Sequence, residues 1–309
     1  MNRPEFVLID WIRAQVRDHE PVRLGIGDDA ASLRPASDRD TLVAIDMLME
    51  GVHFTFPSAT PAQAGRKGLA VNLSDIAAMG GRATAAFVSV ALPNERGMEF
   101  AKEVHRGLIA LAEEFEVVLA GGDTNSWNGP LVISVTVVGE PLKLQPVCRQ
   151  GAVPGDWLFV TGALGGSLPS GRHLTFTPRL REVQTLSQMV DLHAMIDVSD
   201  GLAADLHHLL RASVVGAILD ADSIPLTTTA QNLQDGRSSL LHGLSDGEDF
   251  ELLFAVSPAD GRVLMSQWQH ETPVTKIGEV TSATGCWLRE STGVVTPLLP
   301  LGWTHSLGS

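Results

Sequence analysis

The chain has 309 residues, 44% of them hydrophobic, which is enough to bury a substantial core and suits two domains. Its 36 acidic and 22 basic residues give a formal net charge of -14, which disfavours nucleic acid and anionic membranes as partners. The two cysteines, Cys148 and Cys286, lack the spacing of a disulfide framework or a zinc site. We therefore expect a globular, cytoplasmic protein with reduced thiols.

The first 140 residues alternate helical and strand-like patterns. Residues 1–17 interrupt their apolar positions with charges, as an amphipathic helix does and a signal peptide does not. The patterns predict helices at 61–79 and 95–114 and strands at 41–45, 83–92, 117–120 and 131–138. No apolar run approaches the ~18 residues that a membrane-spanning helix needs. An α/β domain over residues 1–140 follows.

Prolines and glycines cluster between Gly139 and Gly155, where we place the domain junction. Beyond it, the patterns predict helices at 202–210 and 258–269 and strands at 157–161, 194–197, 214–219 and 252–254, with two more strands within 274–288. Residues 141–309 are therefore expected to form a second α/β domain. The predicted fold class is a two-domain α/β fold.

Several aspartates stand in short segments that contain glycine or resemble turns. The chain has no lysine-based phosphate loop, so a phosphorylated ligand needs other cations to neutralise its charge. Carboxylates are the ligands that hard divalent cations prefer. We therefore predict a polynuclear metal site formed by the aspartates of these segments: Asp28, Asp29, Asp46, Asp75, Asp123, Asp197 and Asp200.

Most of these segments also have a purely structural interpretation. Glycine and aspartate are typical of tight turns, and Asp46 and Asp123 are expected at the ends of the strands that precede them. Asp75 differs, because it lies among small and apolar residues, where a carboxylate is costly unless it meets a partner or a metal. A metal role is therefore favoured most clearly at Asp75.

The segment from Asp197 to Gly201 leads from a strand into a helix. Ser199 or Asp200 is the expected N-cap of that helix, and the exposed amides beside it could bind a phosphate. A capping role alone explains the segment equally well. No acid follows at the spacing of a calcium loop, so an EF-hand is disfavoured.

Two further residues carry charge close to glycine. His53 is a lone histidine, and such residues are more often structural than ligands. Glu248 stands before a predicted strand, where it could face a cationic substrate or close the strand's edge. No GxxxxGK[ST] loop, GxGxxG fingerprint, GxSxG elbow or protein-kinase motif set is present, which argues against the standard nucleotide folds.

Seven strings in this order resemble the thiamine-monophosphate kinases, which share a superfamily with aminoimidazole ribonucleotide synthetase. The resemblance extends from about Gly25 to Trp303, and the order and spacing of the strings make it specific. The strings are GIGDDAA, DMLMEGVHF, AVNLSDIAAMGG, GGDT, PGDWLFVTG, IDVSDGL and GEDFELL.

The resemblance implies a kinase that transfers the γ-phosphoryl group of ATP to thiamine monophosphate, with several Mg²⁺ ions bound. It assigns Gly122, Asp123, Arg149 and Ser199 to the nucleotide, and His53, Glu248 and Trp303 to thiamine monophosphate. Its metal positions are Asp29, Asp46, Asp75, Asp123, Asp197 and Asp200. It also implies a homodimer in which strands of the N-terminal domains pair across the interface. No catalytic base is expected, because a phosphate monoester with a second pKa near 6 is largely ionised at neutral pH.

Several positions depart from the family pattern. Ala44 and Ile45 replace a hydroxyl pair, and Asp246 replaces a glycine. His105, which we assign to the nucleotide, stands near the position where family members commonly have a tyrosine. The stretch from Gly165 to Pro178 is also shortened. Two alternatives therefore stay open: a related ATP-using synthetase with another acceptor, and a homologue that binds nucleotide without turnover.

Overall fold

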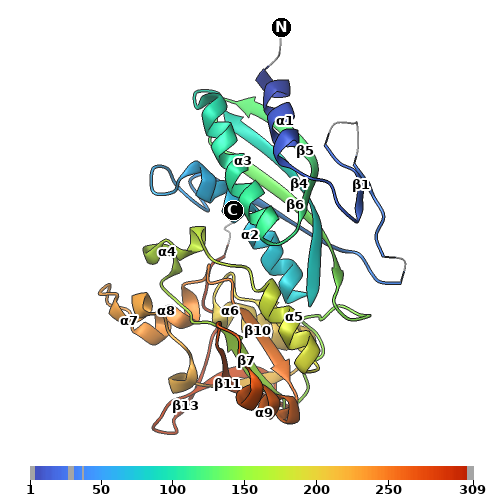
Figure 1. The fold of residues 1–309 in the computed structure, drawn as a ribbon. Helices are drawn as coiled ribbons and strands as arrows, with labels where there is room; N and C mark the ends of the chain where they lie inside the picture. Colours follow the sequence, from blue (N-terminus) through green and yellow to red (C-terminus); the bar gives the residue numbers. More distant parts are fainter. Residues whose placement is uncertain (1–3, 27–30, 37, 305–309) are drawn as a thin grey trace. The chain divides into compact units, whose positions relative to one another are not determined.

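The computed structural model describes residues 4–26, 31–36 and 38–304 and is drawn in Figure 1. The chain divides into two compact units, which we describe separately. Unit 1 comprises residues 1–76 and 81–145, and unit 2 comprises residues 77–80 and 146–309. Within the described ranges, none of the helices combines the length and the hydropathy that crossing a bilayer requires.

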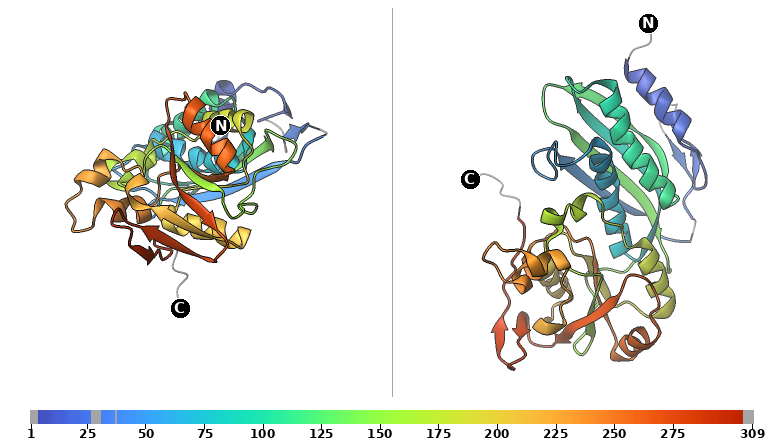
Figure 2. Two further views of the ribbon diagram at one scale, coloured as in Figure 1. Left: turned by 90° about the horizontal axis from the view of Figure 1, so that it is seen from below. Right: turned by 60° about the vertical axis from the view of Figure 1, so that its left-hand side comes forward.

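Unit 1 contains a four-stranded sheet in the order β3 (Leu42–Met49), β6 (Val132–Pro141), β4 (Gly81–Pro93) and β5 (Val118–Trp127). Only the β4–β5 pair is parallel. Helices α2 (Pro61–Ala78) and α3 (Gly97–Glu114) cover one face of the sheet, as Figures 1 and 2 show. The alternating apolar side chains Ile133, Val135 and Val137 of β6 are fully buried beneath them.

Two glycines allow α2 and α3 to approach each other very closely. A Cβ atom at Gly65 would lie 1.9 Å from the Val104 carbonyl oxygen, and one at Gly107 would lie 1.8 Å from the Ala62 carbonyl oxygen. Any larger residue would force the helices apart. This contact fixes α2, and with it Asp75, over the sheet.

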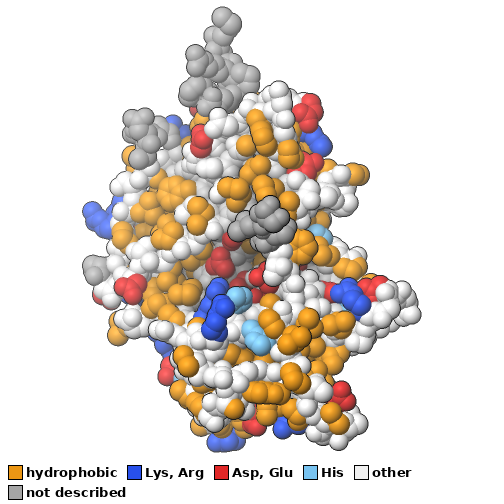
Figure 3. Space-filling view, turned by 180° about the vertical axis from the view of Figure 1, so that it is seen from behind, with side chains coloured by type: hydrophobic (Ala, Val, Ile, Leu, Met, Phe, Trp, Pro, Cys, Tyr) orange, Lys and Arg blue, Asp and Glu red, His pale blue; other side chains and the backbone are white. Residues whose placement is uncertain are grey.

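The opposite face of the sheet is open along its edge strand β3. The side chains that point to this face are apolar and largely exposed: Val43 (64%), Ile45 (67%), Met47 (56%) and Met49 (38%). A small hairpin of β1 (Val22–Leu24) and β2 (Ser32–Leu33) packs against another part of the face, through Val22. Helix α1 (Pro4–Gln15) packs against α3. Figure 3 shows hydrophobic side chains gathered on the side of the molecule hidden in Figure 1.

Unit 2 contains a seven-stranded, mostly antiparallel sheet. Its order is β13 (Val295–Pro297), β12 (Gly285–Arg289), β9 (Gly216–Asp220), β11 (Val274–Thr281), β7 (Trp157–Thr161), β10 (Leu252–Val256) and β8 (Ala194–Asp197). Its longer helices are α5 (Leu180–Met189), α6 (Leu202–Ser213) and α9 (Pro258–Gln267). Short helical segments are α4 (Ser167–Ser170), η1 (Arg172–Leu174), η2 (Ala221–Ser223), α7 (Thr228–Asn232) and α8 (Ser239–Ser245).

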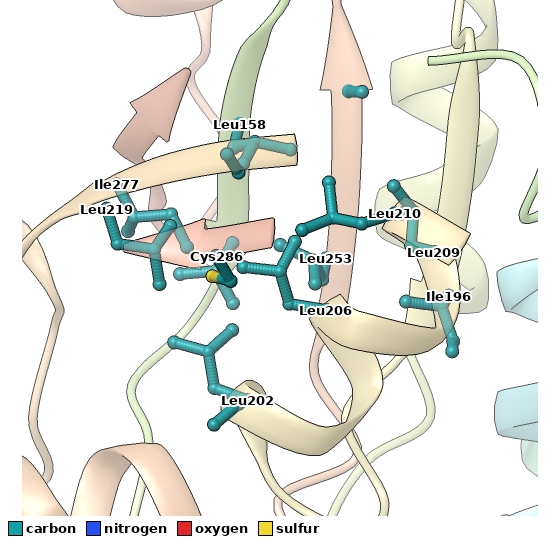
Figure 4. Packing of buried hydrophobic residues seen from close by; sticks show 14 of the residues in the cluster. Leu158, Ile196, Leu202, Leu206, Leu209, Leu210, Leu219, Leu253, Ile277 and Cys286 are labelled. Carbon is teal, nitrogen blue, oxygen red and sulfur yellow. The ribbon is translucent and has the colours of Figure 1, made fainter. Parts of the chain in front are cut away.

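Helix α6 supplies much of the core of unit 2. Its residues Leu202, Leu206, Leu209 and Leu210 point toward the sheet residues Leu158, Ile196, Leu219 and Leu253 (Figure 4). The leucine spacing places them on one face of the helix. Burying each contributes roughly 2 kcal/mol. The loop between β8 and α6 therefore ends at a firmly anchored helix.

Most of the predicted elements are present, and β7 and β8 match the predicted bounds. Two predicted strand ends are wrong: β3 continues past Asp46 to Met49, and β5 continues past Asp123 to Trp127. Both strands stay paired, Asp46 opposite Val135 and Asp123 opposite Ser89, so sheet pairing overrides the low strand propensity of aspartate and glycine. Helix α5 was not predicted.

Candidate functional site

Asp46 and Asp75 meet on the helix-covered face of unit 1. Asp46 comes from the middle of β3 and Asp75 from the last turns of α2, and their side chains share a hydrogen bond. Burial raises the pKa of Asp46, and the hydrogen bond with Asp75 acts in the opposite direction. Two adjacent carboxylates are stable only with a proton or a cation between them, so this pair suits an oxygen-preferring cation.

The turn that carries His53 is fixed from two sides. The Met49 amide donates to His53 Nδ1 at 3.0 Å, so the ring's proton lies on Nε2. The ammonium group of Lys67, a residue of α2, donates a hydrogen bond to the His53 carbonyl oxygen at 2.8 Å. Lys67 is only 1% exposed. His53 therefore presents an N–H donor from a rigid turn, which suits binding of a phosphate or another acceptor.

Asp123 lies apart from Asp46 and Asp75 within this chain. The strand registers place it in one row with Ser89, Ser134 and Met47, on the open face of the sheet. Three strand spacings, about 14 Å, separate it from β3. Its carboxylate is exposed and accepts a hydrogen bond from the Asn125 side chain at 2.8 Å.

No group of three or more acidic, histidine or cysteine side chains has metal-holding geometry among the residues that the structure describes. Asp28 and Asp29 lie outside those residues. Within unit 1 the predicted metal set is thus seen as one hydrogen-bonded pair plus Asp123 at a distance.

Unit 2 brings five of the predicted site residues together around one loop. Asp197 ends β8 and is 5% exposed, while Ser199 and Asp200 follow it. The Glu248 amide donates to the Ser199 carbonyl oxygen at 2.7 Å, and the Trp303 amide donates to the Asp200 carbonyl oxygen at 2.9 Å. Metal, nucleotide and substrate candidates that are far apart in sequence are therefore neighbours here.

Asp205, which the sequence analysis did not single out, organises this loop. Its Oδ2 atom accepts hydrogen bonds from the Asp200 and Gly201 amides, each at 3.1 Å. Gly201, with a φ of 123°, is the N-cap residue of α6. The predicted cap by Ser199 or Asp200 is therefore wrong, and these two amides are occupied by Asp205. The sequence did contain a signal for this role, because Asp205 is an acid in the first turn of a predicted helix, where it can accept hydrogen bonds from backbone amides.

The Asp205 carboxyl has an abnormal pKa. Burial, followed by the charges of Asp197 and Asp200, raises its pKa to about 8, well above the ordinary value of an aspartate, against the lowering effect of the two amides. At neutral pH and without bound cations the group is therefore mostly protonated. A neutral asparagine can accept the same two hydrogen bonds through its carbonyl oxygen.

We expect Asp205→Ala to lower the free energy of unfolding by about 1–3 kcal/mol, because two buried amides lose their acceptor. Asp205→Asn should cost less than about 1 kcal/mol at pH 5. The raised pKa favours the folded state at low pH, and this advantage is lost as pH rises from about 4 to about 8. Thermal unfolding with a chelator should thus show the wild type losing stability relative to Asp205→Asn over that range. A constant difference would contradict the assignment.

The remaining nucleotide candidates differ in accessibility. Arg149 is exposed in unit 2, where its charge helps to lower the pKa of His208 after burial and Arg211. Gly122 lies beside Asp123 in β5. His105 is 4% exposed, its Nδ1 is bonded to the Ala101 carbonyl oxygen at 2.8 Å, and burial lowers its pKa. Because so little of the His105 imidazole ring is exposed, the structure does not favour stacking of the adenine base on it.

The departures from the family pattern have distinct structural consequences. Ala44 shares its face of β3 with Asp46, whereas Ile45 points to the open face, so only residue 44 could direct a hydroxyl toward the Asp46 side. Asp246 accepts a hydrogen bond from the Gly166 amide at 2.9 Å and contacts His242 and Arg237. Asp246 therefore connects the residues before Gly247 to the shortened stretch from Gly165 to Pro178 by a hydrogen bond.

Comparison with known proteins covers nearly the whole chain. The family model "AIR synthase related protein, N-terminal domain" matches residues 27–140, and the corresponding C-terminal domain model matches residues 155–286. A thiamine-monophosphate kinase from Rhodopirellula baltica is 42% identical over 305 residues, which cover 96% of this chain and 95% of that protein. The chain belongs to the thiamine-monophosphate kinase family. This membership confirms the resemblance seen in the sequence strings.

Solved structures of thiamine-monophosphate kinases share the whole fold. The enzyme from Stenotrophomonas maltophilia has a TM-score of 0.80 at 34% identity, covering 92% of this chain and 96% of that one. A structure described as AaThiL complexed with AMPPCP and TMP has a TM-score of 0.76 at 29% identity and covers 99% of both chains. The predicted two-domain fold of this family is thereby confirmed.

Proposed function

We propose that this chain phosphorylates thiamine monophosphate with ATP and forms thiamine diphosphate. The observation that carries the proposal is similarity over nearly the whole chain to thiamine-monophosphate kinases, including one solved with AMPPCP and TMP. The cytosol, where ATP is available, is the compartment that we propose.

The main obstacle in this reaction is charge. Two unit charges 4 Å apart repel by about 4 kcal/mol at an effective dielectric constant of 20. Mg²⁺ bound between donor and acceptor would neutralise this repulsion. The acceptor phosphate is already largely ionised, so the protein needs to align the reactants and exclude competing arrangements instead of removing a proton.

Carboxylate chemistry supports the metal assignment. The Asp46–Asp75 pair and the acids of the Asp197–Asp200 loop are oxygen donors of the kind Mg²⁺ prefers. The charges of Asp197 and Asp200 also raise the pKa of Asp205, which shows how much negative charge gathers in this loop. We assign the metals to Asp29, Asp46, Asp75, Asp123, Asp197 and Asp200.

We assign the remaining candidates to the two substrates. His53, Glu248 and Trp303 would bind thiamine monophosphate, whose thiazolium ring is cationic and suits the Glu248 carboxylate and the face of Trp303. Gly122, Asp123, Arg149 and Ser199 would bind ATP, with Arg149 as the cation for its phosphates. This division is supported by the bonds that join Glu248 and Trp303 to the Asp197–Asp200 loop.

We further propose that the active form is a homodimer. The exposed apolar row of β3 is the kind of surface that a second copy covers. The strand registers also place Asp123 and Asp46 on opposite faces and about 14 Å apart. A second chain can bring Asp123 of one protomer to the Asp46–Asp75 pair of the other, which gives the interface a role in the site.

The direct test is an assay with purified protein, ATP, thiamine monophosphate and Mg²⁺. Formation of thiamine diphosphate and ADP, lost on removal of Mg²⁺, is the expected result. ATP turnover only with a different acceptor would favour a related synthetase. Binding of an unreactive ATP analogue without turnover would favour a silent homologue, for which the replacement at Ala44 is the specific observation.

A further inference from the structure

The segment from Gly247 to Glu251 is held in an unusual backbone conformation. Glu248 and Phe250 have φ values of 56° and 51°, and they are two of four non-glycine residues with positive φ in the described part of the chain. Side chains are strained in this region and persist there only when surrounding contacts fix them. Glu248, the proposed substrate residue, therefore depends on its supports.

One support is the short stretch from Gly165 to Ser167. The Gly165 amide donates to both carboxylate oxygens of Asp249 at 3.0 Å. The Ser167 hydroxyl donates to the Glu248 carbonyl oxygen at 2.6 Å. These bonds hold the backbone immediately after the Glu248 side chain.

The second support is a buried charge network. The side chains of Asp249 and Glu251 are 0% and 1% exposed, which requires cationic partners. Arg172 contacts Asp249 with one terminal nitrogen and Glu251 with the other, the latter at 3.2 Å. Arg179 contacts both oxygens of Glu251, at 2.7 and 2.6 Å. Arg172 thus bridges the acids on either side of Phe250.

The opposite side of the segment is fixed to the Asp197–Asp200 loop. The Phe250 amide donates to the Val198 carbonyl oxygen at 2.8 Å, and Glu248 is bonded in the same way to Ser199. The Phe250 ring stacks on Phe176, with ring centroids 4.1 Å apart. Glu248 is therefore set between the loop with the proposed ligands and the arginine network, while its own side chain stays half-exposed.

We propose that Arg172 is a positioning residue for thiamine monophosphate. Through Asp249 and Glu251 it holds the strained segment in the conformation that presents Glu248 to the cationic part of the substrate. This inference rests on the proposed function and adds a residue that acts on substrate binding through Asp249 and Glu251. It also gives the shortened Gly165–Pro178 stretch a role, because Arg172 lies within it.

The test compares Arg172→Gln, Arg172→Lys and the control Arg289→Gln, which breaks an exposed pair with Asp220 in the same unit. Arg172→Gln should raise KM for thiamine monophosphate about tenfold or more and leave KM for ATP within about threefold. Arg172→Lys should give an intermediate value, since lysine keeps the charge but not the fork that bridges two acids. The control should leave both KM values unchanged.

A double-mutant cycle separates positioning from general stability. In a Glu248→Gln background, Arg172→Gln should add little to KM, because Arg172 acts through Glu248. Amide hydrogen exchange of residues 246–251 without substrate should be faster in Arg172→Gln and Arg172→Lys than in the wild type. This readout applies even if Arg172→Gln is too unstable for kinetics.

Each failure has its own signature. Inactive wild-type protein would refute the proposed function. Unchanged amide hydrogen exchange of residues 246–251 in the Arg172 variants would show that Arg172 does not hold this segment, whether or not the protein is active. Active wild type with equal increases in both KM values, or with additive effects in the cycle, would overturn the inference alone.

Discussion

Replacing Asp123 by asparagine should abolish most turnover and leave the fold intact. We expect kcat to fall at least about a hundredfold, which corresponds to roughly 2.7 kcal/mol of lost transition-state stabilisation. The physical reason is that asparagine keeps the shape of the side chain but removes a negative charge from the proposed metal set. Because Asp123 is exposed and its carboxylate accepts a hydrogen bond from the neighbouring Asn125 side chain, which asparagine can also accept, the melting temperature should change little.

The measurement is the rate of thiamine diphosphate formation over a range of Mg²⁺ concentrations. Asp222→Asn is a matched control, because it makes the same chemical change at an exposed acid in the short η2 helix of unit 2. The control should keep full activity. An Asp123→Asn enzyme with wild-type kcat would remove Asp123 from the metal set.

Local sequence patterns predicted the elements of this fold better than its site. Strand β7 was predicted to the residue because an apolar run stands between Gly155 and Gly162. The same local reasoning failed at Asp46 and Asp123, since pairing with β6 and β4 extends both strands through residues that favour turns. Strand propensity is judged from a residue and its neighbours in sequence, whereas strand pairing depends on residues that are distant in sequence.

The residues that hold the backbone of the candidate site were also out of reach of local sequence patterns. Arg172 and Asp249 are 77 residues apart in the chain, and neither belongs to a local motif that names the other. Asp205 lies only four residues from Gly201, so it was within reach of a local argument, but an acid in the first helical turn is too common to identify the two amides that it binds. Which acids hold the backbone becomes visible only in the folded chain.

A lysine in place of Met47 should separate the dimer and lower activity together. Met47 is 56% exposed in the apolar row of β3, so the substitution places a charge in the proposed interface without disturbing a buried core. Sedimentation should show a shift from dimer to monomer, and kcat should fall about tenfold or more at the same protein concentration. Met265→Lys is the matched control, because Met265 is 67% exposed in α9 of unit 2.

The sharing of one site by two chains has a more specific consequence. Asp46→Asn and Asp123→Asn homodimers should each be inactive, because every site lacks one carboxylate. After mixing and exchange of subunits, each heterodimer contains one complete site, with Asp46 from the Asp123→Asn chain and Asp123 from the Asp46→Asn chain, so activity should return. Random exchange of equal amounts makes half of the dimers mixed, each with one complete site, which predicts recovery to about a quarter of the wild-type rate. If the mixture stays inactive although subunit exchange is demonstrated, Asp46 and Asp123 must act within the same chain. A polynuclear site would then have to span the strands between them.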